Sequence, residues 1–291
     1  MLDVSHIPSQ NQQTFTFYST GNWQTWSKPR NAKMIEIFCL GGGGSGGHPL
    51  ISSSSGTGGG GGGSGGIVRG IIPAFLLPDI IYIFVGKGGI GPKTASTSGS
   101  AGGISYVGLQ PSILEKTLIC KSSTTSAGGG NSTGPAGLGA TISIVALSAF
   151  GNLGMFTSVA GVIGGTGIST TGAGGSSQIA LGSNIITGGA GGGGKGSGIE
   201  YVGIDITPAS VILTSRVSGG QTIGANGESG YGRLQPFCGT GGAGGAAILI
   251  GVGGAGGDGW YGCGGGGSGS GSIVSKAGNG GDGLVIITVI T

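Results

Sequence analysis

Short apolar runs recur along the chain, and most of them are bordered directly by glycine. The runs are rich in Ile, Val and aromatic residues, and their length suits a β-strand better than a helix. The first of them, Thr14-Phe-Thr-Phe-Tyr, alternates polar and aromatic positions, as a strand with one buried face does. We therefore predict strands at residues 14–18, 34–40, 67–72, 80–85, 104–109, 116–120 and 284–290.

The remaining segments give weaker patterns. Pro73 opens the sequence Pro73-Ala-Phe-Leu-Leu-Pro, which predicts one short helical turn because proline is favoured at the first helical position. Residues 140–162 are apolar but interrupted by Gly and Ser, so short strands and a helical turn both stay open. Residues 1–13 are polar and unpatterned, and they predict an N-terminal arm, a candidate docking segment, ahead of a single domain over 14–291.

Closure of this domain follows from its β-structured ends. The simplest arrangement pairs the last strand, 284–290, with an early one such as 34–40. The first and last strands of the domain are then expected to lie close together, and the glycine tracts to run out from the sheet edges.

Glycine tracts separate the apolar runs, and the longest series occupies residues 239–283. Glycine disfavours a helix through its backbone entropy, and it offers a sheet no side chain to pack. The tracts are then either disordered linkers or extended left-handed helices of the polyproline-II type, with three residues per turn. Packed helices would supply the partners that buried backbone groups need. The β-branched runs beside the tracts favour the packed form.

These patterns together predict the fold class. We expect a mainly β protein, an antiparallel β-sandwich of jelly-roll-like form, flanked by a bundle of packed polyglycine-II helices and with almost no α-helix.

Composition narrows the class of protein. Glycine accounts for 78 of 291 residues, against an ordinary share of about 7%. The 10 prolines and the lack of a sustained three-residue period exclude collagen. Disordered chains are usually highly charged and poor in aliphatic residues, whereas only 7% of this chain is charged and 36% is hydrophobic. The net charge of +3 is too small and too scattered to predict a nucleic-acid partner.

Neither a membrane segment nor a cysteine framework is predicted. The N-terminal residues lack the basic and apolar regions of a signal peptide. The most apolar stretch, 67–85, contains an arginine, an aspartate and two prolines, so no membrane insertion is expected. The cysteines are widely spaced without a Cys-x-x-Cys pair, so we read each as a small buried residue. They are Cys39, Cys120, Cys238 and Cys263.

Catalytic motifs are lacking in the sequence. The two histidines, His6 and His48, lie in polar stretches with no carboxylate near them, whereas a hydrolase needs a positioned base and nucleophile. Residues 189–196 nearly match a phosphate-binding loop, but Gly196 occupies the place of the Ser or Thr that holds magnesium. A carboxylate pair for glycoside hydrolysis stays an open alternative that no motif supports. We expect no enzyme, no catalytic residue and no cofactor.

The aspartates within the tracts need a separate explanation. Asp258 and Asp282 each lie in a Gly-Gly-Asp-Gly sequence, and the two sequences are isolated rather than serial as in calcium-binding repeats. We therefore predict no metal site and expect each aspartate to make a local turn bond.

Bulky residues beside the glycine tracts are the candidates for binding a receptor. Trp260 and Tyr261 interrupt the last series, Tyr231 precedes it, and His48 opens a polar segment between two earlier tracts. Aromatic side chains at exposed loop ends can stack on a sugar or a protein partner. The alternative is that the aromatic residues cap the glycine bundle or pack on the sheet.

Several segments of the sequence carry a family resemblance. The sequence Thr25-Trp-Ser-Lys-Pro, the strand 34–40 leading into poly-Gly, and the segments starting at Pro236, Tyr261 and Gly280 together resemble the glycine-rich domain of bacteriophage tail and fibre proteins. The chain also looks like the distal adhesins of T-even-type phages and, more remotely, the glycine-rich domain of the anaplastic lymphoma kinase receptor.

The resemblance implies a function as well as a fold. In such proteins polyglycine-II helices pack beside a β-sandwich, and loops between them carry recognition surfaces. It implies a non-enzymatic virion protein, assembled in the host cytoplasm, that acts as a tail-fibre or adhesin component. Its partners would be a host cell-surface receptor, protein or glycan, and other virion proteins, with a homo-oligomeric state left open. The alternative is a structural virion part, such as a head or collar decoration or an adaptor.

Overall fold

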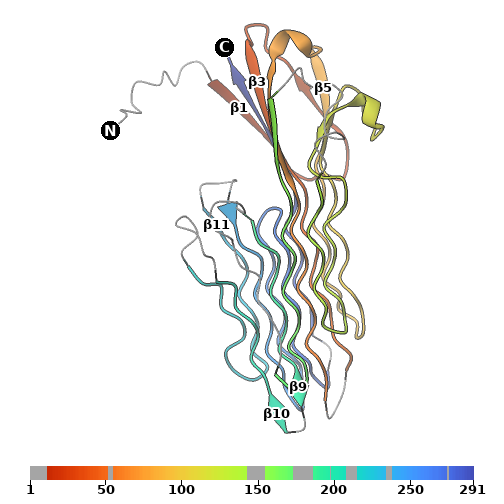
Figure 1. Cartoon of the computed structure of the whole chain (residues 1–291), viewed down its shortest axis with the longest axis vertical. Coiled ribbons are helices and arrows are strands. Elements are labelled where there is room, and N and C mark those ends of the chain that lie inside the picture. Colours follow the sequence, from red (N-terminus) through yellow and green to blue (C-terminus); the bar gives the residue numbers. More distant parts are fainter. Residues whose placement is uncertain are drawn as a thin grey trace, which may run out of the picture.

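The protein is elongated, with β-sheets at one end and extended glycine-rich segments running from them to the other end (Figure 1). The computed structural model describes residues 12–51, 55–142, 155–172, 186–196, 198–207, 215–233, 238–273 and 275–291. In these ranges the regular elements are strands, apart from two 3-10 helices, η3 (Ala74–Leu76) and η4 (Glu115–Thr117). The expectation of a mainly β chain with almost no helix is confirmed.

The larger sheet has five antiparallel strands in the order β1-β13-β3-β4-β8. The closing strand β13 places Leu284 opposite Leu40 of β3, and Ile290 opposite Met34, so the expected pairing of 284–290 with 34–40 is confirmed. The strand bounds are β1 (Gln12–Phe17), β3 (Met34–Leu40), β4 (Ile67–Pro73), β8 (Met155–Val159) and β13 (Leu284–Ile290).

The second sheet has four antiparallel strands in the order β2-β5-β6-β7. Two short hairpin-like pairs, β9–β10 and β11–β12, lie among the glycine-rich segments (Figure 1). The bounds are β2 (Gln24–Ser27), β5 (Ile80–Phe84), β6 (Tyr106–Gly108), β7 (Leu118–Lys121), β9 (Lys195–Gly196), β10 (Ile199–Glu200), β11 (Gly232–Arg233) and β12 (Cys238–Gly239).

Side chains of both sheets meet in one core, because alternate residues of each strand point to the same face. Ile35 and Ile37 of β3 lie in this core with Ile81 and Ile83 of β5, and all four are fully buried. Burying a side chain of this size stabilises the fold by about 1.5–3 kcal/mol. The core is therefore what holds the two sheets together.

The cysteines behave as small buried residues, as the sequence predicts. Cys39 of β3 and Cys120 of β7 lie in the shared core, and burial, followed by the contact with Cys120, raises the pKa of the Cys39 thiol. Burial likewise raises the pKa of Cys263 to about 12.

Several boundaries differ from the sequence expectation. Strand β1 starts at Gln12, inside the predicted arm, whose residues 1–11 lie outside the described part of the chain. Pro73 ends β4 and precedes η3 rather than opening the helix. In the undecided segment 140–162, the strand β8 is present, while 143–154 falls outside the described residues.

Extended glycine-rich segments, which we call strings, form the rest of the molecule. Several continue a strand directly: 41–47 follows β3, 58–66 leads into β4, and 276–282 leads into β13. Their main chain is neither helix nor strand, yet their hydrogen bonds are regular. Further strings occupy residues 86–91, 97–103, 127–131, 134–140, 161–168, 187–194, 240–248, 254–260 and 262–270.

Hydrogen-bond partners along a string repeat every third residue. In the string 41–47, the amides of residues 41, 44 and 47 donate to the string 58–66, and those of 42 and 45 donate to 97–103. The amides of 43 and 46 donate to 276–282, and all of these N···O distances are 2.8–3.0 Å. Successive residues therefore bond in three different directions, unlike a strand, which alternates between two.

A central string has neighbours on all sides. The string 58–66 donates amide hydrogens to 161–168, 262–270 and 127–131, and its carbonyls accept from 41–47, 134–140 and 187–194. Six surrounding strings thus satisfy the backbone groups that burial would otherwise leave unpaired.

Close approach of the strings explains why glycine fills them. A Cβ added at Gly61 would overlap the carbonyl oxygen of Gly189, one at Gly62 that of Gly44, and one at Gly63 that of Leu138. Since the obstacle is the main chain of a bonded neighbour, it cannot move aside as a flexible side chain would. Every direction of the three-residue repeat is blocked in this way.

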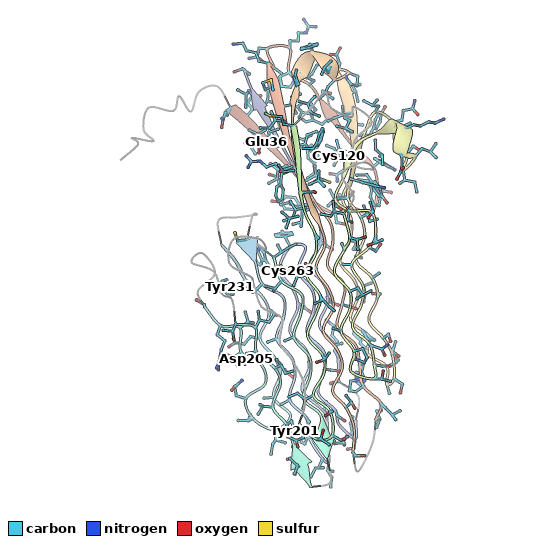
Figure 2. All side chains as sticks on the ribbon, in the orientation of Figure 1. Glu36, Cys120, Tyr201, Asp205, Tyr231 and Cys263 are labelled. Atoms are coloured by element: carbon cyan, nitrogen blue, oxygen red, sulfur yellow. The ribbon has the colours of Figure 1, made fainter. Side chains whose placement is uncertain are left out.

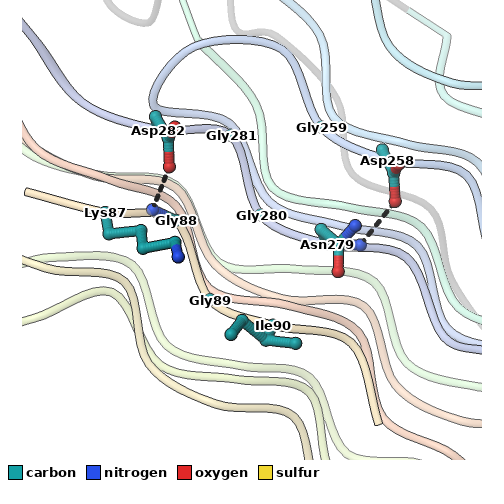
Figure 3. A pocket seen from close by; sticks show the side chains of 10 residues that line it. All are labelled: Lys87, Gly88, Gly89, Ile90, Asp258, Gly259, Asn279, Gly280, Gly281 and Asp282. Atoms are coloured by element: carbon teal, nitrogen blue, oxygen red, sulfur yellow. Dashed lines mark hydrogen bonds between the residues drawn. The ribbon is translucent and has the colours of Figure 1, made fainter. Parts of the chain in front are cut away.

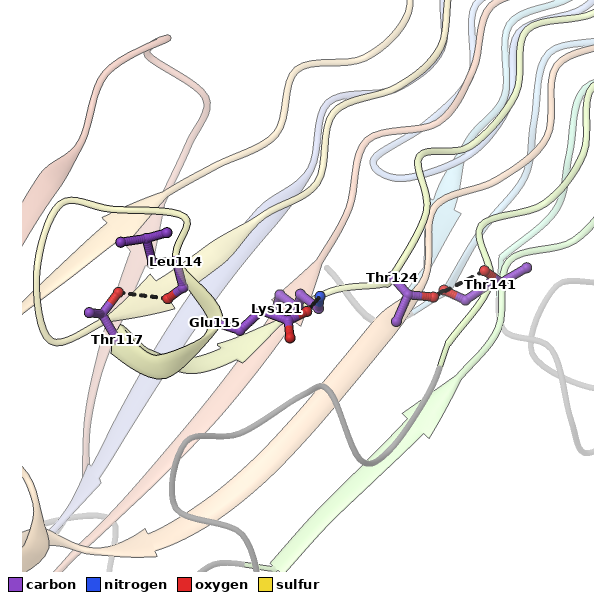
Figure 4. Close-up of polar contacts among 6 residues, drawn as sticks. All are labelled: Leu114, Glu115, Thr117, Lys121, Thr124 and Thr141. Carbon is purple, nitrogen blue, oxygen red and sulfur yellow. Dashed lines mark hydrogen bonds and ion pairs between the residues drawn. The ribbon is translucent and has the colours of Figure 1, made fainter.

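Polar side chains secure the place where sheets pass into strings (Figure 4). After β7, the hydroxyl of Thr124 donates to the carbonyl of Thr141 at 2.9 Å, joining the ends of two strings. The largely buried side chain of Lys121 pairs its ammonium with the carboxylate of Glu115 at 2.6 Å. The hydroxyl of Thr117 donates to the carbonyl of Leu114 at 2.7 Å. These contacts fix the start of the bundle relative to the second sheet.

The packing predicts that Gly62→Ala lowers the free energy of unfolding by about 3 kcal/mol, since overpacking against main chain is not relieved by side-chain motion. Ala101→Ser is the matched control, because Ala101 is exposed on a surface string, and its effect should stay within about 0.5 kcal/mol. Urea unfolding monitored by tryptophan fluorescence measures both. Equal stability of the two variants would contradict the close packing of the strings.

Candidate functional site

The end of the bundle opposite the two large sheets, which we call the tip, gathers loops that are distant in sequence (Figure 1). Gly56 bridges to Lys195 of β9, the amide of Gly224 donates to Ala247, and Val252 bridges to Ile273. Exposed aliphatic side chains stand on these loops: Leu50, Ile51, Ile199, Val202, Ile223, Ile250, Val252 and Ile273.

Exposure at the tip is large for side chains of this kind. Ile250 is 85% exposed, Leu50 63% and Ile223 58%. Scattered apolar residues are normal on a surface, but a group of them at one end of a molecule is a candidate interaction surface. Burial of each against a partner would contribute about 1.5–3 kcal/mol.

Two charged residues near the tip are used internally. Lys195 is fully buried, and its ammonium donates to the carbonyls of Ile248 and Leu249 at 3.3 and 3.2 Å. Glu200 accepts the amide of Leu249 at 2.6 Å. Burial lowers the pKa of Lys195, and the nearby Glu200 opposes that shift. Both charges thus hold the loop that carries Ile250.

The position of Lys195 also shows how residues 189–196, which nearly match a phosphate-binding loop in sequence, differ from such a loop in structure. Residues 187–194 form a string that bonds to 58–66 and 240–248 rather than a loop before a helix. A lysine buried against carbonyl oxygens has no access to a phosphate, so the sequence similarity is accidental.

His48 lies at the tip but inside it, with 2% of its surface exposed. Its Nδ1 contacts the carbonyl of Pro49 at 2.8 Å, and its Nε2 lies 3.1 Å from the amide of Ser275, which donates to it. This pattern requires a neutral ring with the proton on Nδ1. Burial lowers the pKa of His48, with the hydrogen bond to Pro49 as a smaller opposing effect. The ring joins two loops of the tip.

The three aromatic candidates lie elsewhere. Trp260 and Tyr261 are half-buried at the sheet end of the bundle, packed against a cluster that includes Phe38 and Leu284. The Tyr231 hydroxyl donates to the carbonyl of Ser215 at 2.7 Å, and its ring packs on a small core among the strings. The four residues predicted for receptor binding are therefore not brought together into one site.

Surface strings show a further use of polar side chains. Where no neighbouring string supplies a carbonyl, a side-chain oxygen accepts the amide instead. Asp282 accepts from Gly88 at 2.7 Å, Asp258 from Asn279 at 2.7 Å, and Asp205 from Gly219 at 2.7 Å. The expectation of local turn bonds for Asp258 and Asp282 is wrong. In the regular array of hydrogen-bonded strings, which we call the lattice, each carboxylate lies next to the amide of a neighbouring string and accepts from it.

Sequence reasoning missed the aliphatic residues of the tip. They lie next to glycine, serine or threonine in short turns, either singly, as Ile223 does, or in runs such as Leu50-Ile51 and Ile248-Leu249-Ile250 that are too short to show a periodic pattern. The available signal was position: a bulky apolar residue in the short turn between two glycine tracts, such as Ile250, has no neighbour to pack on.

Two further features would point to a different kind of site: a membrane-spanning helix and a cluster of metal ligands. No helix in the described ranges has the length and apolar character needed to cross a bilayer. Within the same part of the chain, no three His, Cys, Asp or Glu side chains come together as a metal site would require.

Comparison with known proteins identifies a family for this chain. The family model of a glycine-rich domain matches residues 18–289, nearly the whole chain. The chain therefore belongs to the glycine-rich domain family. Among curated proteins none matches it.

The tip should loosen in acid because of His48. The folded protein favours the neutral ring, whereas the unfolded chain takes up a proton near pH 6.5, so stability is lost as the pH falls below about 6.5. The slope contributed by one histidine is at most about 1.4 kcal/mol per pH unit. Urea unfolding from pH 5 to 8 should show this slope, and His48→Gln should remove it. The variant His6→Gln measures the share of the other histidine; a slope that persists in His48→Gln would refute the assignment.

Proposed function

We propose that this chain is a bacteriophage virion protein, a tail-fibre or adhesin component, whose tip binds the host cell surface without catalysing a reaction. The observation that carries the proposal is the group of exposed aliphatic residues at the tip, with Ile250 at 85% exposure. These residues stand on loops held by buried polar contacts of Lys195 and His48. A preorganised apolar surface loses little entropy on binding.

The scaffold suits this role. We propose that the strings are polyglycine-II helices, and the three-residue repeat of their hydrogen bonds matches the three residues per turn of that helix. We also propose that the two large sheets form a sandwich of the jelly-roll-like kind, for which their common core is the support. Such a body would hold the tip at a fixed distance from the sheets, and several copies on one particle would add avidity.

A structural role in the virion is the second candidate. Exposed apolar residues also occur on the sheet end, where Phe75 of η3 is 82% exposed and Ile113 and Leu114 precede η4. This end, with the predicted docking segment 1–13, whose last two residues belong to β1, would then dock on another virion protein, and the tip would have no receptor.

The two candidates are separated by comparing the two ends of the molecule. Purified protein, multimerised on a fluorescent carrier, is tested for adsorption to a panel of bacterial strains and for inhibition of infection. The tip variant Ile223→Asp/Ile250→Asp should reduce adsorption at least about tenfold, since it removes two apolar contacts. Phe75→Asp is the control at the opposite end and should adsorb as the wild type does.

Each outcome of that comparison is decisive. Loss of adsorption in Phe75→Asp with an unaffected tip variant would move host binding to the sheet end and refute the role of the tip. Failure of the wild-type multimer to adsorb to any strain of the panel would refute the receptor-binding proposal and support the structural alternative, which has no receptor.

A further inference from the structure

A groove runs along the flank of the bundle over the surface string 276–282, between 86–91 on one side and 254–260 on the other (Figure 3). Its volume is about 360 Å³, within the range of small-ligand sites. Its polar side chains are Lys87, Asp258, Asn279 and Asp282, and Ile90 adds an apolar wall.

The polar groups of the groove are held in place by the lattice of strings. One carboxylate oxygen of Asp282 accepts the amide of Gly88, and one of Asp258 accepts the amide of Asn279, both at 2.7 Å. The side-chain oxygen of Asn279 accepts the amide of Gly91 at 2.9 Å. Each of these three side chains therefore uses one oxygen atom to accept a backbone amide of a neighbouring string, and its second polar atom is left for a ligand.

Charge in and around the groove is balanced. Lys87 and Asp282 both line the groove, and the ammonium of Lys276 lies 3.8 Å from the carboxylate of Asp258. Two carboxylates and two ammonium groups give no net attraction for an anion or a cation. A ligand that both donates and accepts hydrogen bonds without a charge fits this set, and vicinal hydroxyl groups are such a ligand.

Aromatic surface adjoins the sheet end of the groove. The amide of Gly262, next to Tyr261, donates to the carbonyl of Asp282 at 2.8 Å. The ring of Tyr18, 53% exposed, lies 6.2 Å from that of Tyr261. The exposed ring of Tyr18 thus packs on Tyr261, whose chain neighbour Gly262 bonds the main chain of Asp282, and an exposed ring can stack on the apolar face of a sugar.

From this arrangement we infer that the groove binds a short stretch of an uncharged oligosaccharide, with Asp258, Asn279 and Asp282 as the hydrogen-bonding residues. This site is independent of the proposed function: it lies on the flank, and it would bind sugar whether or not the tip contacts a receptor.

The test measures binding of neutral hexasaccharides of glucose, mannose and N-acetylglucosamine to the full chain by saturation-transfer NMR and calorimetry. At least one hexasaccharide should bind, and the double variant Asp258→Asn/Asp282→Asn should weaken it by about tenfold or more. Asparagine retains an oxygen for the amides of Asn279 and Gly88, so the lattice is preserved while the outward acceptor is replaced by a donor.

Asp205→Asn is the matched control. Asp205 accepts the amide of Gly219 at 2.7 Å, as Asp282 does with Gly88. It lies at the left edge of the bundle in Figure 2, and its own segment, 201–206, bonds to 187–194 and 215–220 rather than to the strings that line the groove. It should reproduce any stability change of the groove variants and leave sugar binding intact. Equal loss of binding in Asp205→Asn, or no binding of any hexasaccharide by the wild type, would overturn the assignment. Loss of binding in the tip variant Ile223→Asp/Ile250→Asp alone would also overturn it, by moving the sugar site to the tip.

Discussion

The lateral hydrogen bond between two bare main chains is the interaction on which this molecule depends. A single amide–carbonyl bond contributes only about 0.5–1.5 kcal/mol net, but a buried group left without a partner costs about 1–3 kcal/mol. A string such as 58–66 is surrounded by six others, so it satisfies its groups only when the neighbours are in place. The strings of the bundle therefore fold cooperatively. Glycine is needed here because it lets neighbouring main chains approach closely, not because it is flexible, even though it loses more conformational entropy on folding than other residues do.

Such a lattice must also end somewhere, as a sheet must at its edge strands. The outermost amides have no further string to bond, and the sparse acidic and amide side chains accept them instead. Asp282, Asp205 and Asn279 act in this way, and Glu228 accepts the amide of Ser218 at 2.9 Å. This use explains why a chain with few charged residues places several of them within glycine tracts. It also leaves oriented oxygen atoms on the flanks, where a ligand can reach them.

The sequence predicts some parts of this structure well and others poorly, for physical reasons. Strands such as 34–40 and 284–290 were predictable, because a β-branched run that stops at glycine encodes both the element and its end. The order of the strings was not, since one glycine tract offers every neighbour the same surface. The bond between Asp282 and Gly88 spans 194 positions and leaves no local signal. At the candidate site, the apolar run that ends at Ile250 is too short to show a periodicity, whereas Trp260 stood out in the sequence and packs beside the sheet.

Separation of lattice and loops accounts for how one scaffold can carry different surfaces. Strings that are consecutive in the chain are also neighbours in the bundle: 41–47 bonds to 58–66, and 254–260 to 240–248. Each connecting loop therefore closes over the spacing of two adjacent strings, whatever its sequence. A substitution at Ile250 changes the surface of the tip, whereas one at Gly62 meets the main chain of another string. Buried polar residues such as His48 and Lys195 belong to the loops, but their side chains bond to the backbone of neighbouring segments. They are therefore less free to change than an exposed loop residue such as Ile250. The surface of the tip can therefore change within limits that those few anchored residues set, and independently of the glycine strings.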